Sequence, residues 1–60
     1  MTSKLLIKRK EHQMKQREVA EKLGISNQSY HLKESGKRQF TVQEAIMLSK
    51  VFGCTLDDLF

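Results

Sequence analysis

The chain has 60 residues, of which 38% are hydrophobic, 30% charged and 7% aromatic, and its formal net charge is +4. A chain of this length forms one domain, residues 1–60, and buries only about 60% of its unfolded surface, so little room remains for a catalytic cleft. The single cysteine, Cys54, forms no internal disulfide, and no Cys/His set has zinc-ligand spacing. No apolar run approaches the roughly 20 residues of a membrane span. These features argue against an enzyme, a metal site, a cofactor and a membrane protein. They favour the cytoplasm, with Cys54 as a small buried residue.

The positive charge is concentrated in the first part of the chain. Residues 1–38 carry ten basic and four acidic side chains, a net charge of +6, whereas residues 39–60 carry one basic and three acidic, a net charge of −2. A small basic domain of this kind favours a polyanionic partner, most often nucleic acid. The charge by itself also fits a solvated surface that keeps the protein soluble.

The spacing of apolar residues predicts an all-α fold of five short helices. Proline is absent, and no stretch alternates apolar and polar residues long enough to form a strand. The first helix is expected to begin with Thr2 or Ser3 as its N-cap and to run to about His12, with Leu5 and Leu6 among its apolar residues.

The next two helices are separated by only a short turn. The second, about residues 16–23, is followed by Gly24, the residue type that favours a left-handed helix C-cap. Ser26 is a good N-cap for the third helix, about residues 26–34, and Gly36 closes that helix. A helix, a short glycine-containing turn and a second helix form a helix-turn-helix unit.

Two further helices follow a loop at residues 37–40. Thr41 and Glu44 have the spacing of a capping box for the fourth helix, and Thr55 and Asp58 give a weaker signal for a last helical turn. Gly53 separates the two helices. The expected core stripe of the fourth helix has spacing i, i+3, i+4, i+7, i+10 and consists of Val42, Ala45, Ile46, Ser49 and Phe52.

The start of the third helix carries short polar side chains suited to reading DNA bases. A helix in the major groove places its N-terminal turns against base edges, and Ser26, Asn27 and Gln28 supply hydrogen-bonding groups there. His31 and Leu32 lie on the same exposed face. His31 contacts a base or a phosphate, or is an ordinary surface histidine. Leu32 meets a thymine methyl group, or packs partly buried against a neighbouring helix.

Candidate phosphate-binding groups flank this third helix. Lys15 and Gln16 lie at the first turn of the second helix, where free backbone N–H groups and the helix dipole favour anions. Ser35, Lys37 and Arg38 surround Gly36 and are expected to contact phosphate on the other flank. Such contacts position a protein on DNA and make binding salt-dependent. Each lysine taken singly fits a solvated surface charge, so the prediction depends on their joint placement.

Three motifs carry a family resemblance. Residues 16–30 have the pattern Q-x-x-V-A-x-K-L-G-I-S-x-x-x-Y, residues 33–38 follow with K-E-x-G-K-R, and the last nine residues are F-G-C-T-L-D-D-L-F. Over nearly its whole length the sequence resembles the Cro and lambda-repressor type of helix-turn-helix protein, the xenobiotic-response-element group. Within that group, the pattern Lys33-Glu34…Phe40-Thr41…Glu44-Ala45 is most similar to repressors from phages and prophages of Gram-positive bacteria. The resemblance implies a compact five-helix DNA-binding domain in which Gln16 holds a phosphate, while the bases are read by Ser26, Asn27, Gln28 and Leu32.

The resemblance also implies a partly buried ion pair between Arg9 and Glu34, which gives Arg9 a structural role. Two positions depart from the family pattern. Lys33 stands where the family usually has a large apolar residue, so we expect it to bury only its aliphatic stem. Lys15 stands where Ser or Thr usually caps the helix, which weakens the cap and adds a candidate phosphate contact.

These patterns predict a sequence-specific regulator of transcription that binds double-stranded DNA, a phage-type repressor that occupies an operator. Because one recognition helix contacts only about four or five base pairs, we expect a homodimer on a near-palindromic operator. Leu59 is expected in the core, and Phe60 either in the core or in a dimer contact with Val51 and Phe52. No small-molecule ligand is predicted.

Three alternatives compete with sequence-specific DNA binding. A protein-interaction module of the same fold, such as an antitoxin or an adaptor, has the same helices and differs in its partner. Non-specific coating of nucleic acid explains the charge but leaves the polar start of the third helix unexplained. RNA binding is disfavoured because the chain has only four aromatic residues, three Phe and one Tyr, with no exposed stacking platform.

Overall fold

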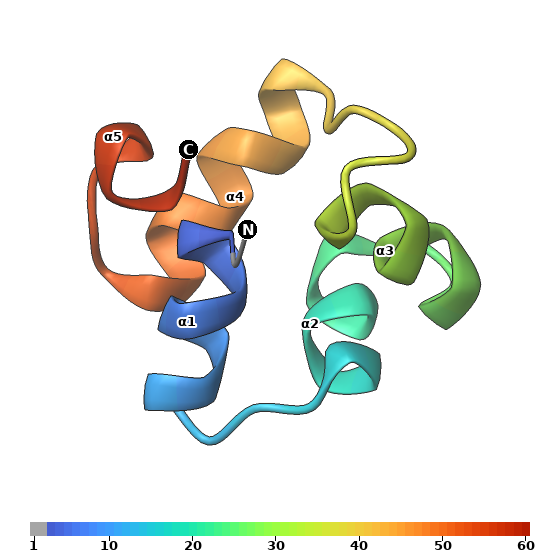
Figure 1. Cartoon of the computed structure of the whole chain (residues 1–60), viewed down its shortest axis with the longest axis horizontal. Coiled ribbons are helices and arrows are strands. Elements are labelled where there is room, and N and C mark those ends of the chain that lie inside the picture. Colours follow the sequence, from blue (N-terminus) through green and yellow to red (C-terminus); the bar gives the residue numbers. More distant parts are fainter. Residues whose placement is uncertain (1–2) are drawn as a thin grey trace.

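The computed structural model describes residues 3–60 and confirms the predicted all-α fold. Five helices occur in this part of the chain: α1 (Lys4–Glu11), α2 (Gln16–Leu23), α3 (Asn27–Glu34), α4 (Val42–Phe52) and α5 (Leu56–Leu59). Helices α2 and α3 form one side of the molecule, and α1, α4 and α5 form the other (Figure 1). None of the described helices has the length and apolar character needed to cross a membrane.

The helix boundaries agree with the predictions because local capping interactions set them. Ser3 caps α1, its Oγ accepting the N–H of Leu6 at 3.0 Å, whereas the other candidate, Thr2, lies outside the described residues. At the opposite ends of α2 and α4, Gly24 and Gly53 adopt left-handed φ values of 73° and 63°, which residues with a Cβ adopt only with strain.

Both predicted capping boxes are present. In α4 the Glu44 N–H donates to Thr41 Oγ1 at 3.1 Å, and the Thr41 N–H donates to Glu44 Oε1 at 2.8 Å. In α5 the equivalent bonds are longer, because the Asp58 N–H donates to Thr55 Oγ1 at 3.3 Å and the Thr55 N–H donates to Asp58 Oδ2 at 3.1 Å. The Thr55 hydrogen bonds lower the pKa of the exposed Asp58 carboxyl. The capping box with the shorter hydrogen bonds thus lies at the start of α4, the longer of the two helices.

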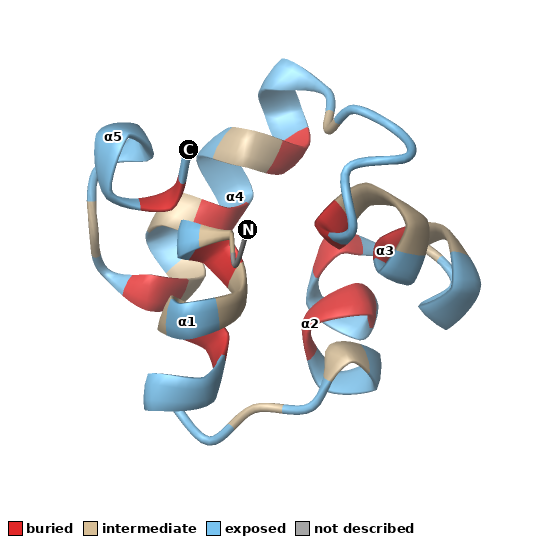
Figure 2. Ribbon diagram, viewed as in Figure 1, coloured by how far each residue is buried: buried red, intermediate tan, exposed pale blue. Residues whose placement is uncertain are grey.

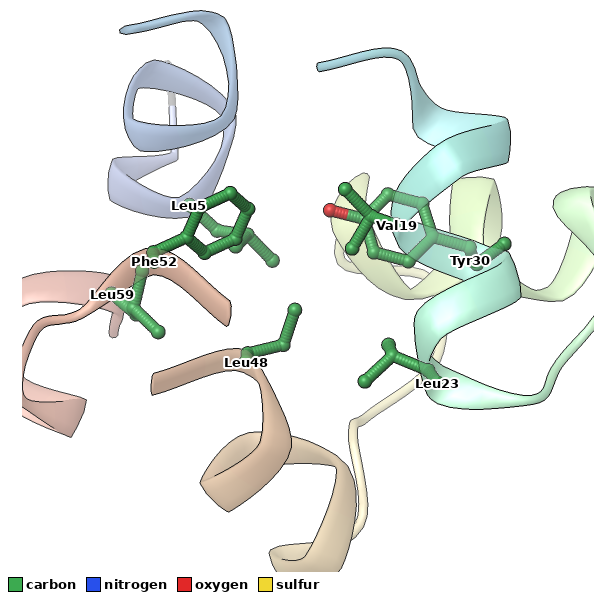
Figure 3. Packing of buried hydrophobic residues seen from close by; sticks show 8 residues of the cluster. Leu5, Val19, Leu23, Tyr30, Leu48, Phe52 and Leu59 are labelled. Carbon is green, nitrogen blue, oxygen red and sulfur yellow. The ribbon is translucent and has the colours of Figure 1, made fainter. Parts of the chain in front are cut away.

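One core joins the two sides of the molecule. Its buried apolar residues are Leu5, Val19, Ala20, Leu23, Tyr30, Leu48, Phe52 and Leu59 (Figure 3). The predicted place of Leu59 in the core is therefore confirmed. Phe60 is 54% exposed, and Cys54, expected to be buried, is only partly buried against the core.

The predicted core stripe of α4 is confirmed at Phe52 and wrong at Val42 and Ile46. The buried face of α4 carries Glu44, Leu48 and Phe52, whereas Val42 is 75% exposed and Ile46 is 42% exposed. Apolar residues occur on several sides of this helix, so periodicity alone allows more than one inward face. Glu44 lies on the inward side at the start of α4, where it is held by its cap and by an ion pair with Lys33.

The orientation of α4 predicts opposite outcomes for two truncations. Leu48→Ala removes a fully buried side chain and should lower the free energy of unfolding by about 2–5 kcal/mol. Val42→Ala, at a position that the periodicity alone assigns to the core, should change it by no more than about 0.5 kcal/mol. Urea titration followed by circular dichroism measures both. Equal losses for the two variants would contradict this orientation of α4.

Candidate nucleic-acid interface

A buried carboxylate at the end of α3 connects three helices. Arg9 Nε donates to Glu34 Oε2 at 2.8 Å, and Arg9 Nη2 donates to Oε1 at 3.0 Å. The Tyr30 hydroxyl donates to Oε2 at 2.6 Å, and Gln16 Nε2 donates to Oε1 at 3.0 Å. Arg9 and Glu34 thus form the ion pair that the family resemblance implies. The Tyr30 and Gln16 bonds add two donors that the sequence patterns did not indicate.

These hydrogen bonds determine the ionisation of the cluster. Burial by itself would raise the pKa of Glu34, but the hydrogen bonds from Arg9, Tyr30 and Gln16 outweigh it and hold that pKa below its usual value. Burial, followed by the hydrogen bond to Glu34, raises the pKa of Tyr30. The hydrogen bond with Glu34 raises the pKa of Arg9. The pair is therefore charged at neutral pH, and Tyr30 keeps its proton.

Arg9 also determines how the chain enters α2. Its Nη1 donates to the carbonyl oxygen of Met14 at 2.9 Å, one residue before Lys15. Lys15 is the N-cap of α2 and has no side-chain acceptor, so only its backbone N–H takes part in capping, donating to Glu18 Oε1 at 3.2 Å. The lysine side chain is exposed and remains a candidate phosphate contact.

The start of α3 is exposed at the edge of the molecule (Figure 2). Asn27 and Gln28 are exposed in the first turn, and His31 is exposed one turn later. Ser26 Oγ is occupied as the N-cap, accepting the Ser29 N–H at 3.0 Å, so its capacity to contact a base competes with this local bond. Leu32 is half-buried and keeps part of its surface toward solvent. The exposed first turn of α3 is thus polar, and its size and position suit insertion into a major groove.

The structure changes the predicted arrangement of the phosphate-binding candidates. Gln16 and Ser35 were expected on opposite flanks of the third helix, yet both line one depression together with His31. The reason is that Gln16 donates to Glu34, which brings the start of α2 beside the end of α3. Gln16 and Ser35 therefore lie on the same flank.

Lys37 and Arg38 lie in the loop between α3 and α4, and both are exposed. Their backbone N–H groups donate to the same acceptor, the Leu32 carbonyl oxygen, at 2.9 and 3.2 Å. This contact folds the loop back on the last turn of α3. Both cationic side chains are thereby attached to the helix whose exposed face carries Asn27 and Gln28.

A second ion pair, between Lys33 and Glu44, was not predicted. Lys33 Nζ donates to both carboxylate oxygens of Glu44 at 2.7 Å, and the side chains are only 14% and 12% exposed. Lys33 therefore pairs its charge as well as burying its stem. Burial by itself would raise the pKa of Glu44, but the hydrogen bonds from Lys33 and Thr41 lower it by a larger amount. The pKa of Glu44 is therefore below its usual value. The sequence signal for this ion pair was Lys33 itself, which stands where the family usually has a large apolar residue.

The arrangement of α2 and α3 across a short glycine-containing turn defines a helix-turn-helix protein. Residues 5–59 match a family model described as "Helix-turn-helix", and the chain belongs to this family. It is 35% identical over 60 residues to an uncharacterized HTH-type transcriptional regulator of Methanocaldococcus jannaschii, in an alignment that covers 100% of this chain and 91% of that relative. Within the described residues, no group of three or more His, Cys, Asp or Glu side chains is placed to hold a metal ion.

The buried carboxylate predicts a specific pH dependence. Because the folded pKa of Glu34 is depressed, its contribution to stability is present above the unfolded value of about 4.3 and is lost as pH falls through the folded pKa. Glu34→Gln should therefore lower the free energy of unfolding by about 3 kcal/mol at pH 7, and the difference from the wild type should shrink on acidification.

The matched control for this comparison is Glu21→Gln. Glu21 lies in an exposed pair with Arg17 at 3.7 Å, so its loss should change stability by no more than about 0.5 kcal/mol at any pH. Urea titrations from pH 7 down to about 3 measure both variants. A Glu34→Gln difference that stayed constant over this range would contradict the assignment.

The Lys33–Glu44 pair predicts measurable coupling. Replacing either partner leaves the other charge poorly solvated, so Lys33→Met and Glu44→Gln should be non-additive by about 1 kcal/mol or more in a double-mutant cycle. The same cycle on Lys8 and Glu11, a more exposed pair at 3.5 Å, should give coupling near zero. Similar couplings in the two cycles would show that burial does not strengthen the Lys33–Glu44 interaction.

Proposed function

We propose that this protein is a sequence-specific regulator of transcription that binds double-stranded DNA with α3 in the major groove. One observation carries the proposal. The exposed first turn of α3 presents Asn27 and Gln28, while the last turn of the same helix is anchored through Glu34. Rigid presentation of hydrogen-bonding side chains at a helix start is what direct reading of base edges requires. Membership of the helix-turn-helix family and the name of the Methanocaldococcus jannaschii relative support the same class of function.

In this proposal the residues of the interface divide into two groups. Asn27 and Gln28 read bases, and Ser26, His31 and Leu32 assist them at the edge of the same face. The phosphate contacts come from Lys15, Gln16, Ser35, Lys37 and Arg38. The amide group of Gln16 has two N–H bonds, and one of them is directed to Glu34, so the other is available for a phosphate oxygen. The phosphate contacts fix register on the duplex, and the base contacts provide specificity.

The proposal extends to the mode of regulation. We infer a repressor of the phage and prophage type that acts in the cytoplasm by occupying an operator. Because one α3 reads only about four or five base pairs, the operator is near-palindromic and two copies bind it. The short sequence motifs shared with phage repressors support this finer assignment.

The decisive experiment is selection of bound duplexes from a random DNA pool. A sequence-specific regulator enriches one motif, and two copies of that motif in inverted orientation report binding by a dimer. An interaction module such as an antitoxin or adaptor enriches nothing. Binding without enrichment would identify a non-specific nucleic-acid protein and overturn the proposal.

Two variants separate base contacts from phosphate contacts on the selected motif. Gln28→Ala should lose about 1–3 kcal/mol of preference at particular base pairs. Lys37→Ala should weaken binding to all sequences alike and reduce the slope of log K against log salt by about 1. Lys50→Ala, an exposed lysine on α4, is the control and should change neither. Fluorescence anisotropy at several salt concentrations measures all three, and loss of base preference in Lys37→Ala would contradict these roles.

A further inference from the structure

The depression that Gln16 and Ser35 share also contains a histidine. Its lining comes from α1, from the start of α2 and from the end of α3, and it includes Gln16, His31, Glu34 and Ser35. His31 follows the base-reading residues along α3, yet the structure places its side chain beside two candidates for phosphate contact. The depression therefore gives His31 a neighbourhood that its position in the sequence did not indicate.

The other polar groups of the depression offer an anion little. One N–H bond of the Gln16 amide is directed to Glu34, so only the second is available. The Ser35 hydroxyl donates its single proton to the Leu32 carbonyl oxygen at 3.0 Å, and it can donate to a phosphate only if that bond breaks. Glu34 is itself an anion at neutral pH. A phosphate at this place therefore needs a further donor that carries positive charge.

The charges around the depression cancel as long as His31 is neutral. Glu34 is paired with Arg9 of α1, whose Nε and Nη2 donate to its two oxygens at 2.8 and 3.0 Å. Tyr30, which donates to the same carboxylate, keeps its proton because its pKa is raised. The residues that α1 and α2 contribute to the lining are uncharged. Among the lining residues, only His31 is of a type that gains a charge near neutral pH.

The neighbouring lysines do not supply this charge inside the depression. Lys15 and Lys37 are exposed close to Gln16 and Ser35 in the sequence, but neither lines the depression. Lys33, on the last turn of α3, is paired with Glu44 of α4 at 2.7 Å. A cation at the depression itself must therefore come from His31.

The ring of His31 is available for such a contact. His31 is exposed, and within residues 3–60 its ring has neither a hydrogen bond nor an aromatic neighbour. The other histidine differs, since His12 Nδ1 lies 3.0 Å from the Lys8 carbonyl oxygen and its ring meets that of Phe52 with centroids 5.2 Å apart. A protonated imidazole has two N–H donors and no acceptor. His31 in this form supplies both the donor and the charge that the depression lacks.

We propose that this depression binds a DNA phosphate only when His31 is protonated, so that DNA binding takes up a proton from solvent. The phosphate oxygens accept one N–H bond from the imidazolium ring and one from the Gln16 amide. When His31 is neutral, the same phosphate faces the Glu34 carboxylate with no compensating cation in the depression. The inference rests on the proposed function and makes His31 a phosphate contact rather than a base contact.

The proposal makes DNA affinity depend on pH in a range where the Glu34 cluster does not titrate. The pKa of Glu34 is below its usual value, so this carboxylate stays ionised between about pH 6 and 8. One charge-assisted contact to phosphate should strengthen binding about five- to tenfold per chain at the lower pH. It should also steepen the slope of log K against log salt by about 0.9 per chain. Base preference should not change, because phosphate contacts carry no sequence information.

Three variants separate the charge of His31 from its mere presence. His31→Gln keeps a polar side chain that cannot be protonated, and His31→Arg carries a permanent positive charge. His12→Gln is the matched control, because His12 is also exposed but does not line the depression. Circular dichroism at about pH 6 and 8 should show that all three variants remain helical, since the replaced side chains are exposed.

The first measurement needs no DNA and uses sulfate as the probe, because the charge of sulfate is the same at both pH values. Magnetic resonance spectra are recorded with sulfate and with chloride at equal ionic strength. At about pH 6 sulfate should shift the ring signals of His31 and the side-chain amide signals of Gln16, and leave the His12 ring unaffected. At about pH 8 the shifts should largely disappear. Equal responses of the two histidines, or equal shifts at both pH values, would overturn the proposal.

The second measurement uses the selected duplex at several salt concentrations and at both pH values. The wild type and His12→Gln should bind more tightly at about pH 6, whereas His31→Gln should bind with the wild type's affinity at about pH 8 throughout. His31→Arg should bind tightly at both. Calorimetry in two buffers of different ionisation enthalpy should detect up to one proton taken up per chain, and none in His31→Gln.

The two measurements distinguish failure of this inference from failure of the proposed function. PH-dependent DNA binding that persists unchanged in His31→Gln would overturn the role of His31 and leave the proposed function intact. Sulfate shifts confined to His31 and Gln16, with no binding to any duplex, would support the anion site and overturn the proposed function.

Discussion

The ion pair and hydrogen bonds of the Glu34 carboxylate are the interactions on which the arrangement of α1, α2 and α3 depends. A buried carboxylate is costly unless its charge is paired and its oxygens accept hydrogen bonds. Here the charge is paired with Arg9 of α1, and further bonds come from Gln16 of α2 and from Tyr30 of α3. Moving any of these helices would leave part of the carboxylate without a partner. The cluster therefore specifies where α3 ends relative to α1 and α2.

The same cluster connects the interior with the surface proposed to contact DNA. Gln16 is only partly buried, and one bond of its amide orients the rest of the group toward the depression that it shares with His31 and Ser35. The Lys33–Glu44 pair acts similarly at the other side of α3, because it joins this helix to the start of α4. In a 60-residue domain with a thin core, these two ion pairs join α3 to α1 and to α4.

Local signals in the sequence predicted most of the secondary structure. Ser3, Thr41 and the glycines that end α2 and α4 act within one turn of their own position, so their effect does not depend on the rest of the fold. The exposed start of α3 was also predicted, because Asn27 and Gln28 follow directly after the cap. By contrast, the sharing of one depression by Gln16 and Ser35 depends on how two helices cross, and the sequence patterns placed them on opposite flanks.

By itself the sequence determined the all-α class, the helix boundaries and the polar character of α3, because capping, glycine conformation and side-chain type are local properties. Only the tertiary structure decided which side of α4 faces the core, since Leu48 and Ile46 are equally apolar and differ only in what packs against them. The pairing of Lys33 with Glu44 was decided in the same way, because it joins two helices across a loop. The basic composition alone also fitted a role in solubility, whereas the structure shows that the basic residues have different places in the fold. Arg9 and Lys33 lie inside the fold as partners of glutamates, while Lys15, Lys37 and Arg38 remain exposed around α3.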